Sequence, residues 1–220
     1  MSSPVDVVLP CLDEAGALPS VLAAIAPSYR AIVVDNGSTD GSPEIARRFG
    51  ATVVYASERG YGSAVHAGLE AATAPIVVCC DADGSFDMHQ LGRVVDPIMR
   101  GEADLCFGRR VPSSASAWPI HARFANWVLL RFVRWKIRVP VEDLGPMRAA
   151  RRDALLGLGL QDRRSGYPLE LLLRARRNNW RIAEVPVDYQ ARVGQSKVTG
   201  TLRGTVQAIT DMLRMLRRYS

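Results

Sequence analysis

The sequence predicts an α/β fold with a mostly parallel central sheet flanked by helices. Short β-branched runs alternate with helix-compatible stretches in the first half of the chain. Strand, helix, strand units at this spacing form parallel sheets through right-handed crossovers. With 220 residues, 48% of them hydrophobic, the chain can bury one sizeable core. We therefore expect one domain over residues 1–220, with a first half over about 1–108 and a second half over about 109–220.

Four strands, each followed by a helix, are expected in the first half. Each strand is an apolar run with the composition of a buried strand. The runs are VDVVLP at 5–10, AIVVDN at 31–36, ATVVYA at 51–56 and IVVCCD at 76–81, and the helices are at 17–26, 42–49, 62–72 and 87–99. The second half predicts a helix over about 168–177, a short strand pair around 182–190, and a final amphipathic helix.

Carboxylates follow three of these strands, in the segments Pro10 to Glu14, Asp35 to Asp40 and Asp81 to Ser85. Ligands of such sheets bind at the carboxyl ends of the strands, and an acidic cluster in one crevice needs a cation. Asp81 and Asp83 are two residues apart, so both face one side if the strand geometry continues. Their oxygens suit Mg²⁺ or Mn²⁺, which also take waters and substrate phosphates. Aspartates in such a pair also cap turns, so both interpretations stay open here.

The turn after the second strand contains several polar side chains. Asp35 ends the strand, where an acceptor can meet the N–H edge of a nucleotide base. Ser38 and Asp40 are expected to cap the helix that starts near Ser42.

Glycines stand just before the predicted helix at 62–72 and within it. Gly60, Gly62 and Gly68 allow the backbone to approach a ligand closely. Val65 stands where a GxGxxG motif needs its third glycine, so the dinucleotide-binding fingerprint of a dehydrogenase is missing.

Six motifs, in order and spacing, resemble those of family-2 glycosyltransferases. They are VVLPCLDEAG, VVDNGSTDGS, RGYGSAVHAG, CCDADGSFD, GPMRAARRDAL and YQARVGQSKVTG, and they span about residues 4–212. They are most similar to the branch of dolichol-phosphate-mannose synthases and polyprenyl-phosphate glycosyltransferases. The resemblance implies a GT-A fold, the fold of nucleotide-diphospho-sugar transferases. It also implies transfer of a hexose, with inversion, from a nucleotide diphosphate sugar such as UDP-glucose or GDP-mannose.

The resemblance also implies roles for single residues on the donor side. Asp81, Ala82 and Asp83 match the metal-binding DxD, so Asp81 and Asp83 are the expected ligands of Mg²⁺ or Mn²⁺. The residues that match the family's contacts to base and ribose are Pro10, Leu12, Glu14 and Asp35. The residues that match the RxGxSK element, which closes over the diphosphate, are Arg192, Ser196 and Lys197, and both arginine and lysine recognise phosphate. Gly60 is a further expected donor-binding residue.

The acceptor side departs from the pattern of the family. Ser85 replaces the glutamine of DADLQ, and the segment 142–148 is shorter than the usual Asp, Ser, Gly, Phe, Arg arrangement. A polyprenyl phosphate acceptor is already anionic, so it needs no base, and Arg109 or Arg148 would position its phosphate. A hydroxyl acceptor needs a base, for which Asp143 is the best placed carboxylate. We prefer the lipid phosphate on the resemblance, and with that acceptor Asp143 would be structural. Over the two alternatives together, Asp143 and Arg148 are the candidate catalytic residues.

Basic residues are concentrated in two segments. Residues 105–141 carry seven basic and no acidic side chains, and residues 191–220 carry six basic and one acidic. Such segments suggest anionic partners. The stretch from Trp118 to Trp135 fits a helix at an anionic membrane surface and a helix packed on the sheet equally well. The final helix has a core-facing or membrane-facing stripe of Leu202, Val206, Ile209, Leu213 and Leu216.

The cysteines and the N-terminus indicate a location. No basic leader precedes a long apolar run, so we expect a cytoplasmic protein, with peripheral contact at the inner face of the cell membrane for a lipid acceptor. The cysteines lie in apolar runs without CxxC spacing, which indicates buried, reduced thiols. They are Cys11, Cys79, Cys80 and Cys106.

Two other classes of protein explain less of the sequence. A sugar-phosphate nucleotidyltransferase needs a basic, glycine-rich loop after the first strand, and residues 11–16 contain no basic side chain. A non-catalytic module that binds a membrane or a nucleic acid explains the basic segments. It leaves the three acidic strand ends unexplained, so no nucleic-acid partner is expected.

Overall fold

The computed structural model describes residues 4–114, 117–118, 123, 126–128, 130–131, 133–134, 141–194, 210–212, 214–216 and 218. In the first half, strands and helices alternate: β1 (Val5–Cys11), α1 (Leu18–Ala23), β2 (Tyr29–Asp35), α2 (Ser42–Arg48), β3 (Thr52–Tyr55), α3 (Tyr61–Ala71), β4 (Ile76–Cys79), η1 (Met88–Gln90) and α4 (Leu91–Met99). The elements that follow are β5 (Leu105–Pro112), β6 (Arg148–Arg151), α6 (Arg152–Gly157), α7 (Tyr167–Arg177) and β7 (Ile182–Tyr189).

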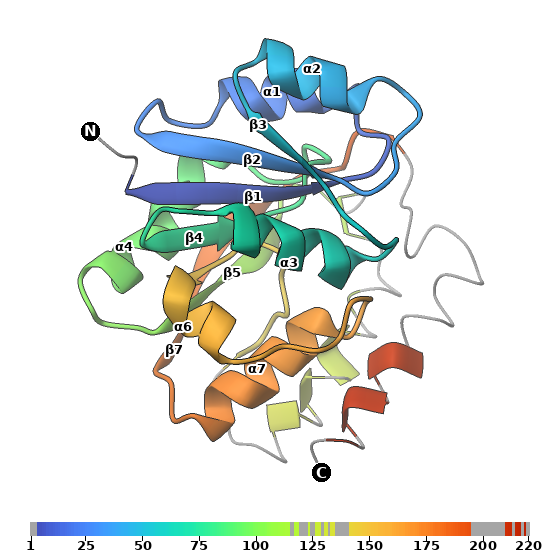
Figure 1. The fold of residues 1–220 in the computed structure, drawn as a ribbon. Helices are drawn as coiled ribbons and strands as arrows, with labels where there is room; N and C mark the ends of the chain where they lie inside the picture. The colour runs from blue at the N-terminus through green and yellow to red at the C-terminus, as the bar shows by residue number, and fades with distance from the viewer. Residues whose placement is uncertain are drawn as a thin grey trace.

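The strands form a seven-stranded sheet in the order β3-β2-β1-β4-β6-β5-β7. Strand β6 runs antiparallel to β4 and β5, and the other neighbouring strands are parallel. The predicted mostly parallel α/β fold is therefore confirmed (Figure 1). Because β2, β1 and β4 are neighbours, their carboxyl ends meet at one edge of the sheet. Antiparallel β6 begins at this same edge, where Arg148 pairs with Cys79 of β4.

Helices cover both faces of the sheet. Helices α3, α6 and α7 lie together on one face (Figure 1), and α1, α2 and α4 pack on the other. Side chains alternate between the two cores: Val8 and Ile32 belong to the core under α3, and Val7, Leu9 and Val33 to the opposite core. The strands are buried on both faces, which is why they are continuous apolar runs in the sequence.

The structure confirms most of the predicted elements and corrects one. The four predicted strands and their helices are present, and the helix expected over 168–177 is α7. The strand pair expected around 182–190 is wrong, because this segment is the single strand β7, which pairs with β5. Strand β6 was not predicted, since its sequence Arg-Ala-Ala-Arg lacks β-branched residues. It forms a strand because it fills the position between β4 and β5.

The described part of the last helix packs on the protein. Met215 is buried in the core under α3 and α7, and Met212 and Leu216 pack partly against it. Leu216 belongs to the predicted stripe, and for it the core-facing interpretation holds. The other members of the stripe, Leu202, Val206, Ile209 and Leu213, lie outside the described residues. Within the described part of the chain, no helix is long and apolar enough to cross a membrane. All four cysteines are free and buried, as expected.

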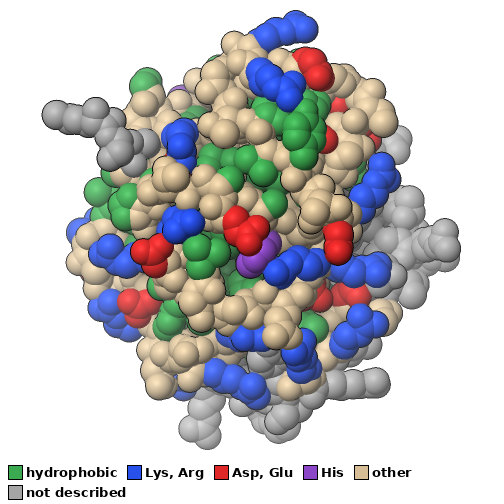
Figure 2. Space-filling model, in the orientation of Figure 1, with side chains coloured by type: hydrophobic (Ala, Val, Ile, Leu, Met, Phe, Trp, Pro, Cys, Tyr) green, Lys and Arg blue, Asp and Glu red, His purple; other side chains and the backbone are tan. Residues whose placement is uncertain are grey.

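Arginines are abundant over α6 and α7. Figure 2 shows basic side chains predominating over the lower part of this face, with single acidic side chains among them. Helix α7 has Arg174, Arg176 and Arg177 in its last turn, where the helix dipole favours positive charge. Basic charge is therefore also gathered outside the two segments that the sequence indicated.

Gly68 allows α3 to lie close to the sheet. A Cβ atom at this position would lie 2.3 Å from Cγ1 of Val8 and 2.9 Å from Cγ2 of Val34. Neither valine can withdraw, because both are fully buried. The distance between α3 and strands β1 and β2 therefore depends on this glycine.

We predict that Gly68→Ala destabilises the protein by about 1–3 kcal/mol, because an added methyl group overpacks the core. Gly92 of α4 is the matched control, since nothing lies within 4 Å of its Cβ position. Gly92→Ala should stabilise by about 0.5–1 kcal/mol, as alanine is the better helix former. Urea unfolding followed by circular dichroism measures both. Equal effects of the two substitutions would contradict the close packing of α3.

Candidate active site

Buried carboxylates gather at the carboxyl ends of three neighbouring strands. Glu14 lies in the loop after β1, Asp35 ends β2, and Asp81 and Asp83 follow β4. Glu14, Asp35 and Asp83 are at most 9% exposed. The sheet order therefore brings together the three acidic segments that the sequence singled out, and charges of one sign this close require cations.

The loop that carries Glu14 is held by the turn after β2. The backbone N–H groups of residues 13–15 donate to Ser38 Oγ, Ser42 Oγ and Asp40 Oδ2, each at 2.9 Å. Asp40 Oδ1 also accepts the backbone N–H of Ser42, the first residue of α2, at 3.0 Å. The N-cap of α2 is Gly41, which makes no side-chain cap, so neither Ser38 nor Asp40 is the N-cap residue that the sequence suggested. Their side chains instead fix the position of Glu14.

Asp35 is bound within its own turn. Its carboxylate accepts the backbone N–H groups of Gly37 at 3.2 Å and Ser38 at 3.1 Å. The contact of Asp35 with a nucleotide base stays a prediction. Pro10 is half-buried near the end of β1, Leu12 is half-buried just after it, and Ala82 is buried.

Gly60 and Gly62 approach the protein's own backbone. A Cβ on Gly60, whose φ is +156°, would lie 2.2 Å from the carbonyl oxygen of Arg163, and one on Gly62 would lie 2.8 Å from the carbonyl carbon of the same residue. The backbone N–H of Gly62 donates to the carbonyl oxygen of Arg164 at 3.2 Å. The close approach that the sequence suggested toward a ligand is thus made toward residues 163–164, which pack against the first turn of α3. A donor contact of Gly60 stays a prediction.

Ser85 orients the carboxylate of Asp83, whereas the carboxylate of Asp81 has no such donor in the described part of the chain. Asp83 Oδ1 accepts the Ser85 hydroxyl at 2.6 Å and its backbone N–H at 2.9 Å. Asp81 accepts no hydrogen bond from the described residues. Desolvation and then the charge of Asp83 raise the pKa of Asp81 to about 7, against the opposing influence of Arg148, Arg192 and Arg110.

These two carboxylates fit a hard divalent cation. Burial, and after it the negative charge of Asp83, raises the pKa of Asp81, and a positive ion at the two carboxylates would oppose this shift. The described residues contain no group of three or more His, Cys, Asp or Glu arranged to hold a metal. Mg²⁺ or Mn²⁺ bound by Asp81 and Asp83 would therefore complete its shell with water and phosphate oxygens, as these ions commonly do.

Arg192 enters the acidic cluster from the segment after β7. Its Nη2 donates to Glu14 Oε1 at 2.8 Å, and its Nη1 lies 3.3 Å from Asp83 Oδ2. The structure thus brings Arg192 to the expected donor site. Ser196 and Lys197, the other expected residues of this segment, lie outside the described residues.

Arg110 is a functional candidate that the sequence did not reveal. Its guanidinium makes a bidentate pair with Asp143, with Nε to Oδ2 at 2.8 Å and Nη2 to Oδ1 at 2.7 Å, and lies 3.8 Å from the ring centre of Trp118. The backbone N–H of Arg110 also donates to Asp143, at 2.9 Å. Since strand β5 was not predicted, its alternation could not distinguish Arg110 from Arg109. The sequence offered one signal for Arg110, which is that it stands next to Arg109, a residue already singled out as acceptor-binding.

A cavity of about 1080 Å³ opens beside Asp143. Five arginines contribute to its wall, among them Arg109 and Arg110, and the indole rings of Trp118 and Trp127 contribute apolar surface. Arg109 lies 3.8 Å from Glu184 and its side chain is 39% exposed, so it can reach a ligand in this cavity. The wall combines positive charge with aromatic surface, which suits an anionic, partly apolar molecule.

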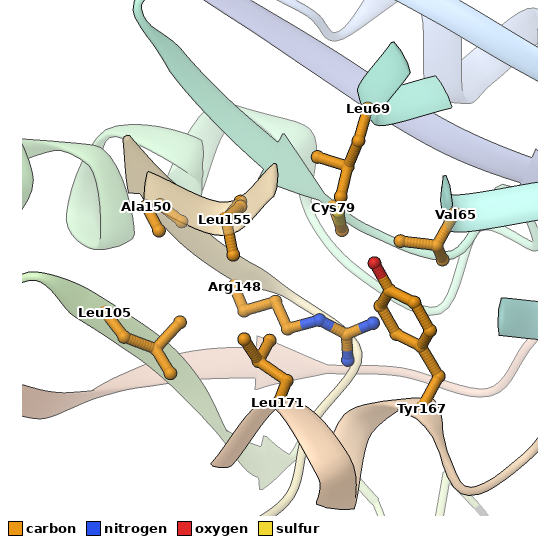
Figure 3. Close-up of a pocket in the computed structure, with 10 residues that line it drawn as sticks. Val65, Leu69, Cys79, Leu105, Arg148, Ala150, Leu155, Tyr167 and Leu171 are labelled. Carbon is orange, nitrogen blue, oxygen red and sulfur yellow. The ribbon is translucent and has the colours of Figure 1, made fainter. Parts of the chain in front are cut away.

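Arg148 lies in the interior. Figure 3 shows its guanidinium between Tyr167 and the strands, among apolar side chains. It is 2% exposed, its Nη2 donates to Tyr61 Oη at 3.1 Å, and its Nε and Nη1 have no hydrogen-bond partner in the described structure. This burial argues against the expected direct contact of Arg148 with an acceptor. Its charge instead acts on Asp81 from behind, where it lowers the pKa of that carboxyl.

Fold and site together define a glycosyltransferase of the GT-A class. A sequence model described as Glycosyl transferase family 2 matches residues 6–157. The chain belongs to this family, and the fold class expected from the motifs is confirmed.

Relatives in three organisms are similar over most of the chain. An uncharacterized glycosyltransferase of Mycobacterium tuberculosis is 53% identical over 213 residues, covering 96% of this chain and 97% of that protein. A dolichyl-phosphate hexose transferase of Haloferax volcanii is 35% identical, covering 87% and 85%. An undecaprenyl-phosphate mannosyltransferase of Micrococcus luteus is 28% identical, covering 94% and 91%.

Solved structures share the fold. Glucosyl-3-phosphoglycerate synthase from Mycobacterium tuberculosis, in complex with phosphoglyceric acid, matches with a TM-score of 0.74 and 25% identity, covering 96% of this chain and 79% of that one. The same enzyme in complex with Mn²⁺, UDP-glucose and phosphoglyceric acid matches with a TM-score of 0.73 and 25% identity, over the same shares.

We predict that Ser85→Ala weakens Mn²⁺-dependent binding of a nucleoside diphosphate by about 10- to 100-fold, because Asp83 loses the hydroxyl that orients it. Titration calorimetry with UDP or GDP, with and without Mn²⁺, measures the change. Ser20→Ala is the control, since the Ser20 hydroxyl donates only to the Ala17 carbonyl in α1. Unchanged affinity in the Ser85 variant would show that Asp83 needs no such support.

Proposed function

We propose that this chain transfers a hexose from a nucleotide diphosphate sugar to a polyprenyl phosphate, with inversion and with the help of Mg²⁺ or Mn²⁺. The observation that carries the acceptor class is the arginine-lined cavity, whose Arg110 also acts on Asp81 of the acidic strand ends. The protein would act at the cytoplasmic face of the membrane, where such an acceptor resides. Each part of the proposal rests on a different set of residues.

The acidic strand ends support the donor part. Asp81 and Asp83 would hold a divalent ion, which when bound would supply Lewis-acid stabilisation of the leaving diphosphate. Glu14 and Asp35 stand on the β1 and β2 side, where the base and ribose would lie. The solved glucosyl-3-phosphoglycerate synthase binds Mn²⁺ and UDP-glucose, so UDP-glucose is the first donor to test. GDP-mannose is the second, since one relative is named a mannosyltransferase.

The cavity wall supports an anionic, partly apolar acceptor. Arg110 lines the cavity and its charge also acts on Asp81, so it stands between the two halves of the site. Its planar fork is held by Asp143 and by the ring of Trp118, which leaves a preorganised cation for a phosphate group. Two relatives are named for dolichyl phosphate and undecaprenyl phosphate, which agrees with this chemistry.

In the proposed reaction a phosphate oxygen of the acceptor attacks the anomeric carbon of the hexose. A new bond forms between them, the bond from that carbon to the diphosphate oxygen breaks, and its electron pair leaves with the nucleoside diphosphate. A phosphate monoester has a second pKa of about 6, so at neutral pH the attacking oxygen is already anionic. The task of Arg109 and Arg110 is then to bind and orient the phosphate. Arg192 and Lys197 would stabilise the diphosphate as it departs.

A soluble hydroxyl acceptor is the second candidate, because the solved structural relative binds phosphoglyceric acid. Such an acceptor needs a base, for which Asp143 remains the candidate. Asp143 is 2% exposed, and both of its carboxylate oxygens accept from Arg110. A carboxylate engaged in this way is poorly placed to take a proton from a substrate. The geometry therefore favours the lipid phosphate, with Asp143 as a positioning residue for Arg110.

The cavity's outer rim supports contact with an anionic membrane. Trp127 is 55% exposed and Val128 is 46% exposed, and Arg131 lies 5.8 Å from the Trp127 ring. Tryptophan and arginine side by side are typical of proteins that lie at the headgroup level. This surface continues into the cavity wall, so a lipid could keep its chain in the bilayer while its phosphate reaches Arg110.

The proposal predicts transfer of labelled hexose to a polyprenyl phosphate, and none to the corresponding alcohol. Purified protein, UDP-glucose or GDP-mannose, Mn²⁺ and acceptor in vesicles are the reactants, and mass spectrometry identifies the product. Anionic vesicles should give faster transfer than neutral ones, since the cavity rim is basic. Asp83→Asn should abolish transfer.

Two outcomes would contradict this function. Transfer to a phosphorylated hydroxy acid but not to any lipid phosphate would establish the second candidate. Full activity of the Asp83 variant in metal-free buffer would remove the metal from the mechanism.

A double-mutant cycle separates the two roles of Asp143. If Asp143 only positions Arg110, then Asp143→Asn and Arg110→Lys should each raise the acceptor KM by about 10- to 100-fold, and the double variant should be little worse than either. If Asp143 is a base, Asp143→Asn should lower kcat by about 10² to 10⁴ and flatten the acidic limb of the pH profile. Arg47→Lys on α2 is the control for arginine replacement, as Arg47 contacts Glu44 and Tyr55 on α2 and β3, at the other end of the sheet from β5.

A further inference from the structure

Arg192 occupies the space between two buried carboxylates of the donor site. Its Nη2 is 2.8 Å from Glu14 and its Nη1 is 3.3 Å from Asp83, whose side chains are only 9% and 6% exposed. Asp83 is also one of the two residues expected to hold the metal. A guanidinium here therefore supplies the positive charge that a divalent ion would otherwise supply, and it uses one of the same oxygens.

The backbone beside Arg192 is fixed to the loop that carries Asp83. The backbone N–H of Gln190 donates to the Ser85 carbonyl, and that of Val193 to the Asp83 carbonyl, both at 2.9 Å. The Gln190 side chain donates to the Gly84 carbonyl at 2.9 Å. With the main chain held on both sides of Arg192, its long side chain is the part that can change partners.

One donor of Arg192 is left without a protein acceptor. Its Nε is buried and has no hydrogen-bond partner in the described structure. A buried N–H without an acceptor is costly, and hydrogen bonds from arginine to phosphate oxygens are strong. The guanidinium therefore stands to gain from an anionic ligand placed next to the acidic cluster, such as the diphosphate of a donor.

We propose that Arg192 is a resident counter-cation that keeps divalent metal out of the nucleotide-free site and moves to the diphosphate when the donor binds. This inference rests on the metal and donor chemistry proposed above. Metal alone would have to displace the guanidinium from Asp83 and leave Arg192 with Glu14 as its remaining carboxylate partner. Metal and nucleotide together offer Arg192 a new partner, so each should strengthen the binding of the other.

The test is the affinity of the nucleotide-free protein for Mn²⁺, followed by the electron paramagnetic resonance signal of the aqueous ion. Wild type should bind Mn²⁺ weakly, and Arg192→Gln should bind it about tenfold more tightly or better, because a nearby positive charge is gone. Arg192→Lys keeps the charge but cannot bridge two carboxylates, so its affinity should lie between them. Arg47→Gln is the control for net charge, as Arg47 contacts Glu44 and Tyr55 on α2 and β3.

A second measurement follows the coupling between metal and nucleotide. Saturating Mn²⁺ should raise the UDP or GDP affinity of wild type by about tenfold or more, and that of Arg192→Gln by clearly less. If wild type shows this coupling but Mn²⁺ binding without nucleotide is unchanged or weaker in both Arg192 variants, the inference is wrong and the proposed function stands. If wild type binds no Mn²⁺ with any nucleoside diphosphate, the metal-dependent function fails, and the inference with it.

Discussion

The crowding of carboxylates at one edge of the sheet is the constraint on which the site depends. The first half of the chain places Glu14, Asp81 and Asp83 there, with little exposure to water. The second half supplies the cations, because Arg110 of β5 and Arg148 of β6 act on the same charges, as does Arg192 after β7. Each half needs the other, since charges buried without counter-charges are costly. The antiparallel strand β6 matters here, as it brings Arg148 to the acidic edge.

Much of the surrounding structure serves to hold these groups still. The turn after β2 fixes the loop of Glu14 through three hydrogen bonds to backbone N–H groups. Ser85 orients Asp83, and Asp143 orients Arg110. The start of α3 is closed by residues 163–164, which Gly60 and Gly62 allow to approach. The side chains of the candidate site are thus supported by partners from other strands and loops, as precise sites require.

The relatives are named for different acceptors. Their names and ligands include lipid phosphates in two cases and a small phosphorylated acid in a third. All three acceptors carry a phosphate group. A cavity wall with several arginines is suited to that shared feature.

The sequence by itself determined the parallel sheet, the three acidic strand ends and the Asp81 and Asp83 pair. These follow from local patterns, because buried strands are apolar runs and their ends are marked by turn residues. Strand β6, the Arg110 and Asp143 pair and the burial of Arg148 were decided only by the tertiary structure. No local pattern encodes them, since β6 is a strand only between β4 and β5, and a charged side chain is buried only where distant partners accept it. The glycines at 60 and 62 show the same limit: their positions were evident, but the segment they approach lies a hundred residues further along.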